Sequence, residues 1–396
     1  MKVLSIILLL FSNSLFAANL YFCNQPLDDM PIQTGGRVKP LYVHANESVK
    51  FLTGKSKIGE LNATTVYCLL TLEGMGVKND LKLTARIEHS KLQEKLNIKE
   101  SNVLYEDIVN EFSEIRSEYM MQKENNSYKK SLSALLSKIE LYQSITSAQN
   151  WMVAVKKDGE ITWQPFSEAI TKEEVSELSK TSLNPILTIL DKSREHYKIL
   201  ENDHYLIELS YAKARLFSWS MLTCLIALIF FFTQRGLTIG FIFLSLTLGL
   251  EMTGLILRIL ISGRAPITNM YETVMFSGFG GLIIALIIYQ IKKEKIFISA
   301  GLAYNVLCLM MMQFANNMLD SSIKPLVPVL RDNFWLSTHV TCIILSYGAL
   351  ALSWMLANLI MIQKILGKSK ESTKLGLIRS RRSCSSQLSK AEEGSG

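Results

Sequence analysis

The stretch of sequence that decides the fold occupies residues 237–262 and reads LTIGFIFLSLTLGLEMTGLILRILIS. Only two of its side chains, Glu251 and Arg258, are charged. About 20 consecutive apolar residues in a helix cross a hydrocarbon layer roughly 30 Å thick, and a core helix of a soluble domain rarely has such a run. This stretch is therefore predicted to be a transmembrane helix.

Four more apolar runs of similar length occur at residues 214–233, 273–291, 296–315 and 339–363. Together the runs predict an all-α polytopic membrane bundle of about five transmembrane helices. With 48% apolar residues and six cysteines among 396 residues, the chain is neither intrinsically disordered nor a small disulfide-stapled protein. The formal charge of +7 lies largely beside these runs, so membrane lipid is an expected partner and nucleic acid is not.

The start of the chain has the order of a secretory signal peptide, predicted at residues 1–18. Lys2 precedes a short apolar stretch and then small residues. Leu15 or Phe16 stands where a small residue is preferred before the cleavage site, so an uncleaved anchor is the alternative. In either case residues 19–212 are expected to be translocated.

The charges of the connecting loops agree with this orientation. Loops 234–235 and 292–295 are rich in Lys and Arg, whereas loops 263–272 and 316–338 carry similar numbers of acidic and basic residues. Positively charged loops stay in the cytoplasm. The predicted organisation is a signal peptide at 1–18, an extracytoplasmic domain at 19–212, a transmembrane module at 213–366 and a disordered cytoplasmic tail at 367–396.

The extracytoplasmic domain is predicted to be mostly helical. Residues 101–148 and 166–210 have apolar side chains at helical spacing, and residues 151–163 read as two short strands around a turn. Cys23 and Cys68 lie in an oxidising compartment in this topology. They either form a disulfide or remain as two buried thiols.

One histidine is a candidate metal ligand. The sequence lacks HExxH, CxxC, GxSxG and Walker patterns, so conventional soluble-enzyme chemistry is poorly supported. His339 lies at the outer end of the fifth predicted span, four residues after Trp335. An imidazole and an aromatic ring at that depth suit a planar ligand with an apolar face and a charged edge. The alternative is a polar interfacial residue that caps the helix.

The two charged residues of the second span are also unusual. Glu251 and Arg258 are two helical turns apart and therefore share one helix face. Charge inside a membrane is costly and usually faces the bundle interior or a water-lined cavity. The pair either locks neighbouring helices together or has a ligand-facing or proton-handling role.

The loop at residues 263–272 reads GRAPITNMYE. Its Gly and Pro favour a tight turn, and Arg264, Asn269 and Glu272 provide charge and hydrogen bonding at the membrane face. We therefore expect these three side chains to contribute to a binding site.

Three stretches of the chain carry a family resemblance. They are the loop at 263–272, residues 324–341 (KPLVPVLRDNFWLSTHVT) and residues 30–41 (MPIQTGGRVKPL). These stretches resemble the CcsA/ResC-type cytochrome c biogenesis proteins, the membrane part of the System II cytochrome c synthetase, in its long fused form. The resemblance covers residues 23–41 and roughly 214–363.

The resemblance implies that His339 is an axial ligand to haem on the extracytoplasmic side, with apocytochrome c as a partner. The family also has a Trp-rich motif, WGxxWxWD, followed by a second external histidine. In this sequence no Trp follows Trp354 and no His follows His339. The chain therefore resembles the first part of the synthetase module. Three alternatives account for the missing motif: a naturally shortened chain, a chain split from a separate partner that supplies the motif, or a frameshift near residues 366–372.

The function predicted from the sequence is haem handling and delivery in c-type cytochrome maturation, on the outer face of the bacterial cytoplasmic membrane. Haem needs an apolar surface for its ring and a neutral imidazole for its iron. Whether the chain is itself a synthetase of the haem lyase type stays open, because the Trp-rich motif is missing. The rival interpretation is a non-catalytic integral membrane scaffold or a transport protein.

Overall fold

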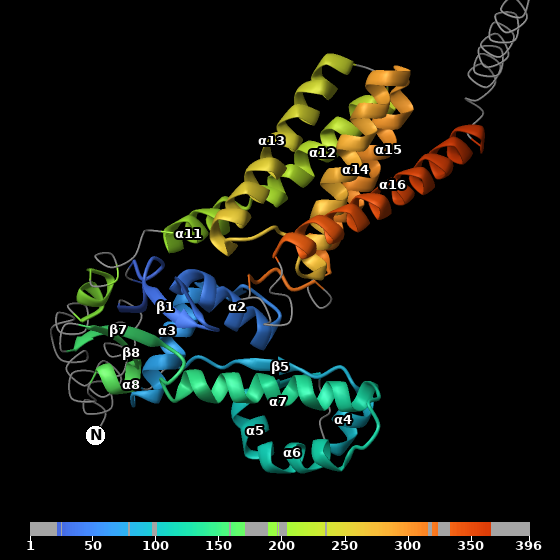
Figure 1. Cartoon of the computed structure of the whole chain (residues 1–396). Helices are drawn as coiled ribbons and strands as arrows, with labels where there is room; N and C mark the ends of the chain where they lie inside the picture. Colours follow the sequence, from blue (N-terminus) through green and yellow to red (C-terminus); the bar gives the residue numbers. More distant parts are fainter. Residues whose placement is uncertain are drawn as a thin grey trace, which may run out of the picture. The chain divides into compact units, whose positions relative to one another are not determined.

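The computed structural model divides into two compact units, one that ends at Ala214 and one that begins at Arg215 (Figure 1). Each unit has a hydrophobic core of its own. The predicted signal peptide and the predicted tail fall outside the residues that the structure describes. The described residues are 22–24, 26–77, 80–96, 101–157, 160–170, 189–195, 197, 204–233, 236–315, 319–323 and 333–365.

The N-terminal unit combines helices with short antiparallel strand pairs, so its predicted mostly helical character is confirmed. Its helices are α2 (Leu41–Thr53), α3 (Ala63–Gly74), α4 (Ser90–Lys95), α5 (Tyr105–Asn110), α6 (Phe112–Met121), α7 (Ser127–Thr146), α8 (Phe166–Ala169) and α11 (His204–Ala214). Its strands pair as β1 (Pro31–Thr34) with β2 (Arg37–Pro40), β3 (Lys57–Ile58) with β4 (Leu61–Asn62), β5 (Thr84–Arg86) with β6 (Asn102–Leu104), and β7 (Met152–Lys157) with β8 (Glu160–Pro165).

A tight hairpin formed by β1 and β2 lies near the start of this unit. Thr34 pairs with Arg37, which leaves Gly35 and Gly36 as a two-residue turn. Both glycines have a positive φ, 57° and 81°. A type I′ turn requires this conformation at both positions, and residues with a Cβ adopt it only with strain. The Gly-Gly pair in the stretch 30–41 therefore shapes the hairpin.

Two predicted elements of this unit are confirmed. β7 and β8 form the antiparallel hairpin expected at 151–163. α7 begins where the Asn126 side chain accepts a hydrogen bond from the Lys129 backbone N–H at 2.9 Å. The apolar positions that predicted this helix are all buried, namely Leu132, Leu135, Leu136, Ile139 and Tyr142.

The rest of the predicted helical segment 101–148 is different in the structure. Residues 101–126 contain β6, α5 and α6 rather than one continuous helix. β6 forms because its backbone pairs with β5, and Thr84 lies opposite Leu104. Such a pairing between distant residues overrides local helical spacing. The other predicted helical segment, 166–210, is described only near its two ends, at α8 and from residue 189 onward.

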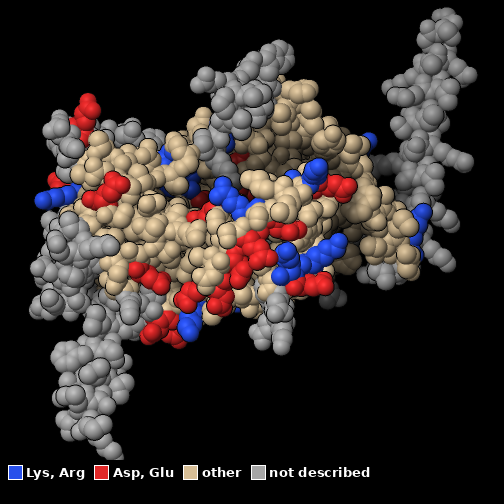
Figure 2. Space-filling view, turned by 90° about the horizontal axis from the view of Figure 1, so that it is seen from below, with Lys and Arg blue, Asp and Glu red and all other residues tan. Residues whose placement is uncertain are grey.

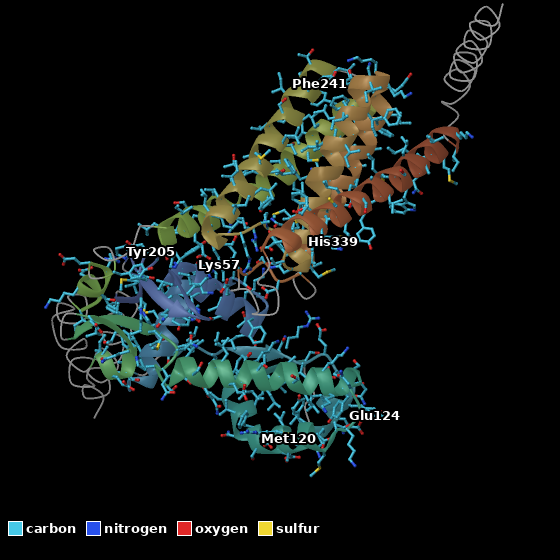
Figure 3. The ribbon with its side chains drawn as sticks, in the orientation of Figure 1. Lys57, Met120, Glu124, Tyr205, Phe241 and His339 are labelled. Atoms are coloured by element: carbon cyan, nitrogen blue, oxygen red, sulfur yellow. A yellow bond between two sulfur atoms is a disulfide. The ribbon has the colours of Figure 1, made fainter. Side chains whose placement is uncertain are left out.

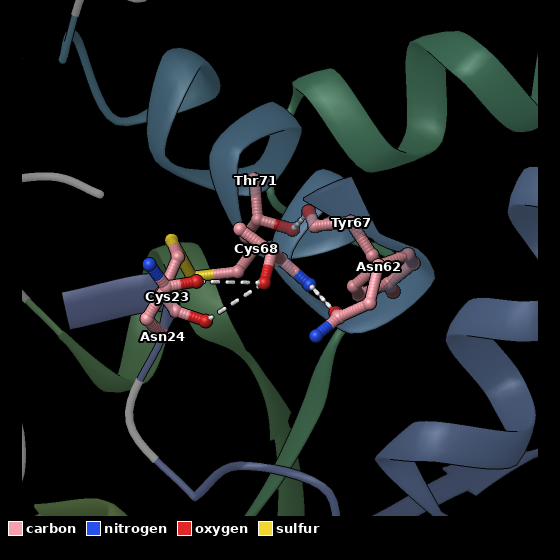
Figure 4. The surroundings of a disulfide bond; sticks show 7 residues. Cys23, Asn24, Asn62, Tyr67, Cys68 and Thr71 are labelled. Carbon is pink, nitrogen blue, oxygen red and sulfur yellow. Dashed lines mark hydrogen bonds between the residues drawn. A yellow bond between two sulfur atoms is a disulfide. The ribbon is translucent and has the colours of Figure 1, made fainter. Parts of the chain in front are cut away.

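Cys23 and Cys68 form a disulfide bond that ties the start of the unit to α3 (Figure 4). Thr65 of α3 donates its hydroxyl hydrogen to the Cys23 carbonyl at 3.3 Å and to Asn24 Oδ1 at 3.1 Å. Asn62 caps the helix, because its Oδ1 accepts a hydrogen bond from the Thr65 backbone N–H at 2.8 Å. Of the two alternatives predicted for these cysteines, the structure has the disulfide.

A buried polar network joins α2 and α3 to the segment before β7. His44 and Tyr67 both hydrogen-bond to Asn150 Oδ1, at 2.6 and 2.8 Å. His44 is 6% exposed, and burial lowers its pKa to about 4. The imidazole is therefore neutral at pH 7 and donates its ring N–H to Asn150.

The surface of the N-terminal unit carries charges of both signs. Its exposed acidic residues include Glu106, Asp107, Glu111 and Glu114 on α5, α6 and the residue between them. The face seen in Figure 2 shows Asp and Glu side chains interspersed with Lys and Arg. A mixed and charged surface is typical of a domain in contact with water.

The C-terminal unit is a bundle of long helices. They are α12 (Leu216–Thr233), α13 (Leu237–Ser262), α14 (Met270–Lys292), α15 (Lys295–Phe314) and α16 (Asn333–Ile365). Five helices of the described chain are long and apolar enough to cross a membrane, and these are Tyr205–Thr233, Leu237–Ser262, Met270–Lys292, Lys295–Phe314 and Thr338–Ile362. They confirm the predicted spans, although the first begins at Tyr205 rather than at residue 214. The chain is therefore a multi-pass membrane protein.

Small residues let these helices approach closely. α12 packs against α13 and α15, and α14 packs against α15 and α16 (Figure 1). A Cβ atom added to Gly278 of α14 would lie 2.7 Å from Asn305 Oδ1 and 2.8 Å from the Cβ of Cys308, both on α15. Close contact through small residues is a common way for membrane helices to pack.

Candidate functional site

The loop between α13 and α14 has a fixed shape. α13 ends at Gly263, whose φ of 66° is the left-handed conformation that favours glycine. α14 begins after Asn269, whose Oδ1 accepts a hydrogen bond from the Glu272 backbone N–H at 2.8 Å. The Glu272 carboxylate reaches back and accepts hydrogen bonds from the Thr268 backbone N–H and hydroxyl, each at 2.8 Å. Asn269 therefore caps α14, and the Glu272 carboxylate holds Thr268, the residue before the cap.

A buried ion pair anchors this loop to α13. Arg258 Nε lies 2.9 Å from Glu272 Oε1, and each side chain is 1% exposed. Arg258 also donates from Nη2 to the Ser321 carbonyl at 3.1 Å, and its guanidinium lies over the Tyr271 ring at 5.1 Å. One arginine thus holds together α13, the start of α14 and the segment 319–323.

Arg264 occupies a different position in the loop. Its side chain is half-buried, and its Nη2 donates a hydrogen bond to Thr268 Oγ1 at 3.1 Å. Thr268 therefore links Arg264 to Glu272. The structure brings together three of the predicted site residues, Arg264, Asn269 and Glu272, around this threonine.

His339 lies in the first turns of α16, where its side chain is exposed (Figure 3). Among the described residues, none forms a hydrogen bond with its imidazole. Trp335 lies one turn earlier in the same helix, and its side chain falls outside the described residues. α16 begins at the end of the bundle at which α13 ends and α14 begins (Figure 1). The predicted site residues therefore occupy one end of the C-terminal unit.

The two charged residues of α13 bond to different helices. Arg258 pairs with Glu272 of α14, whereas Glu251 accepts hydrogen bonds from Ser220 of α12 and Asn305 of α15. Sequence reasoning placed Glu251 and Arg258 on one helix face but did not find these partners. For Arg258 a signal was present, because an intramembrane cation needs a counterion and Glu272 is the next acidic residue beyond Glu251.

Comparison with known proteins assigns the C-terminal part of the chain. Residues 267–391 match the family model described as cytochrome C assembly protein. This region is similar to the cytochrome C assembly protein family. The family match includes Asn269, Glu272, Trp335 and His339, while Arg264 lies just before its first residue. The predicted relation to CcsA-type proteins is confirmed for this cytochrome C assembly region.

Individual relatives support the same assignment. The chain is 30% identical over 149 residues to the cytochrome c biogenesis protein CcsA of Synechococcus sp. (strain CC9311), which covers 37% of this chain and 48% of the relative. It is 35% identical over 106 residues to CcsA of Chlorella vulgaris, covering 26% and 32% respectively. It is 34% identical over 101 residues to protein NrfI of Wolinella succinogenes, covering 25% and 10%. The chain spans less than half the length of each of these relatives.

Proposed function

We propose that this protein handles and delivers haem in the maturation of c-type cytochromes, supporting covalent attachment of haem to apocytochrome c. The observation that carries the proposal is the exposed His339 inside a region similar to the cytochrome C assembly family. A neutral imidazole with a free ring nitrogen is a common axial ligand of haem iron. The residues present on α16 therefore fit this cofactor.

An apolar surface for the ring supports the same proposal. Tyr347, Leu350 and Trp354 of α16 are 62%, 66% and 63% exposed. They follow His339 by 8, 11 and 15 residues, and at about 100° per residue these spacings put all four on one side of the helix. At about 1.5 Å per residue, Tyr347 is roughly 12 Å along the helix from His339, and Leu350 and Trp354 extend the apolar surface farther along the same side. A haem held by His339 would supply the iron chemistry itself.

Arg264 is the residue of the loop best suited to meet a haem propionate. Both Glu272 oxygens accept hydrogen bonds within the protein, and the Asn269 side chain caps α14. These two residues therefore hold the loop in place, while the half-buried Arg264 guanidinium carries the positive charge that pairs with a carboxylate.

The proposed location is the bacterial cytoplasmic membrane, with the N-terminal unit and the site on the extracytoplasmic side. The disulfide between Cys23 and Cys68 supports this orientation, because such bonds persist in oxidising compartments. The basic loops at 234–235 and 292–295 support it independently. The signal peptide at 1–18 remains part of the proposal. A partner that carries the Trp-rich motif would complete the haem site.

The test is the haem content of the purified full-length protein, made with and without a co-expressed fragment that carries WGxxWxWD. We expect a Soret band in the wild type that falls steeply in His339→Ala. His339→Cys should restore part of the band at a shifted wavelength, because a thiolate also ligates haem iron. Thr338→Ala, a change at the neighbouring exposed residue, is the matched control and should retain haem.

The rival interpretation makes the opposite prediction. A non-catalytic scaffold or a transport protein would show no Soret band that depends on His339. Equal haem content in the wild type and His339→Ala under both expression conditions would therefore contradict the proposed function.

A further inference from the structure

The middle of α13 contains a buried acidic side chain that the proposed haem site does not use. Glu251 lies fourteen residues after the first residue of α13 and eleven before the last, and it is 2% exposed. The whole of α13 is one of the five candidate membrane spans. The carboxyl group is therefore buried both within the bundle and near the centre of a transmembrane helix.

The two oxygens of Glu251 have different surroundings. Oε1 accepts a hydrogen bond from Ser220 Oγ of α12 and another from Asn305 Nδ2 of α15, each at 2.8 Å. Oε2 is buried and has no hydrogen-bond partner among the described residues. One oxygen is thus held between two neighbouring helices, and the other is left without a donor.

No positive charge balances this carboxyl group within the described part of the chain. The nearest cation along α13, Arg258, is paired with Glu272. The titratable residues of α12 and α15 are Cys224 of α12 and Tyr304, Cys308 and Lys295 of α15. The first three are neutral in their protonated forms, and Lys295 is the first residue of α15, ten residues before Asn305. Thr223 and Thr247 hydrogen-bond to each other at 2.8 Å and add no charge.

An ionised carboxylate in this setting would be strongly disfavoured. Moving an unpaired charge into an apolar interior costs far more than moving a neutral hydroxyl group. A metal cation is a poor counterion here, because Ser220 and Asn305 direct hydrogen-bond donors, not lone pairs, at the carboxyl group. Oε1 accepts two hydrogen bonds, whereas Oε2 accepts none. A proton on Oε2 fits this arrangement.

We infer that Glu251 is a proton-binding site in the membrane, with the proton on Oε2 and with Oε1 as the carbonyl oxygen that accepts from Ser220 and Asn305. This acid is separate from the proposed haem site and does not depend on it. An O–H group without a fixed acceptor is able to give up its proton to a group that approaches it, whereas a carboxylate in an ion pair is not.

Infrared spectroscopy of the full-length protein tests the protonation state directly. The difference spectrum between the wild type and Glu251→Gln at neutral pH should contain the carbonyl stretch of a protonated carboxyl group, shifted in heavy water. If the difference spectrum instead contains the bands of an ionised carboxylate, the inference is overturned. Gln is the appropriate variant because its amide has the shape of the neutral acid and preserves the acceptor for Ser220 and Asn305.

Chemical modification of the wild type provides a second test that needs no variant to fold. A lipophilic carbodiimide reacts with a protonated carboxyl group. The O–H adds across one N=C bond, and the product rearranges to a stable N-acylurea that contains every atom of both reactants. The adduct should map to Glu251 and be absent from Glu272, which is equally buried but paired with Arg258. No adduct on Glu251, or equal modification of the two residues, would overturn the inference.

Discussion

Arg258 and Glu272 meet at 2.9 Å with 1% exposure each, so a buried ion pair joins α13 to α14 across the loop that separates them. Breaking a buried pair on one side leaves an uncompensated charge and costs about 3–5 kcal/mol. We expect Arg258→Met and Glu272→Gln each to lower the unfolding free energy in detergent by an amount of that order.

The double variant Arg258→Met/Glu272→Gln separates the pair from its surroundings. In the double variant neither charge is left unpaired. Its unfolding free energy should therefore fall by clearly less than the sum of the decreases in the two single variants. Denaturant titration of all four proteins measures this coupling. Strictly additive losses would show that the pair contributes no interaction energy.

Arg264 should affect function more than stability. Its side chain is half-buried, and its side-chain hydrogen bond to Thr268 joins two parts of the same loop. We expect Arg264→Ala to lower cytochrome c maturation in cells that contain the complete system, with the protein still inserted at its normal level. Arg264→Lys, which keeps the charge but loses the planar guanidinium, should have an intermediate effect. Unchanged maturation at equal protein level would count against this role.

The N-terminal unit should lose stability as the solution becomes acidic. The pKa of His44 is lowered by burial from its usual 6.5 to about 4, so between these pH values the unfolded chain binds a proton that the folded unit does not. The unfolding free energy of the unit should therefore fall by up to about 3 kcal/mol as the pH falls from 6.5 to about 4. Below that pH, protonation of His44 should cause no further loss.

Hydrogen exchange of α2 peptides in the full-length protein, followed against pH, measures this loss. Burial raises the pKa of Glu47, which makes a contribution of opposite sign as the pH falls, so a matched variant is needed. His44→Gln keeps a donor for Asn150 but cannot titrate. Its pH dependence should be flatter than that of the wild type, and an identical profile would rule out His44 as the cause.

The orientation in the membrane predicts where reporters work. A reporter active only in the cytoplasm should function when fused after Lys295 or Lys370, and a reporter active only outside should function after Lys157 or Ser322. Cytoplasmic activity of a fusion after Ser322 would reverse the proposed orientation of the site, because Ser322 lies in the segment that Arg258 holds through the Ser321 carbonyl.

The parts of the fold that the sequence predicts are those that local patterns encode. Apolar run length predicts the five spans, and helical spacing from Leu132 to Tyr142 predicts α7. Contacts between distant residues are not encoded locally. The strand pair that places Thr84 opposite Leu104 replaced a predicted helix, and the sequence left the pairing of Cys23 with Cys68 undecided.

The candidate site shows the same limit. Residue types alone selected Arg264, Asn269 and Glu272, and the structure brings them together around Thr268. Their division into one half-buried cation and two residues that hold the loop depends on hydrogen bonds that spacing does not reveal. Glu251 likewise finds Ser220 and Asn305, 31 and 54 positions away, only when the helices pack.

The disulfide of the N-terminal unit has a consequence for the compartment in which haem attachment is proposed. Cys23 and Cys68 are 1% and 0% exposed, and thiol–disulfide exchange requires a thiolate to reach one of the sulfur atoms. Reduction must therefore wait until the unit opens. A cytochrome precursor needs its own thiols reduced to accept haem, and its extended chain leaves them open to attack. Burial thus protects the disulfide of this protein kinetically. A single pool of reductant is therefore able to keep the thiols of a cytochrome precursor reduced while this structural bond stays oxidised.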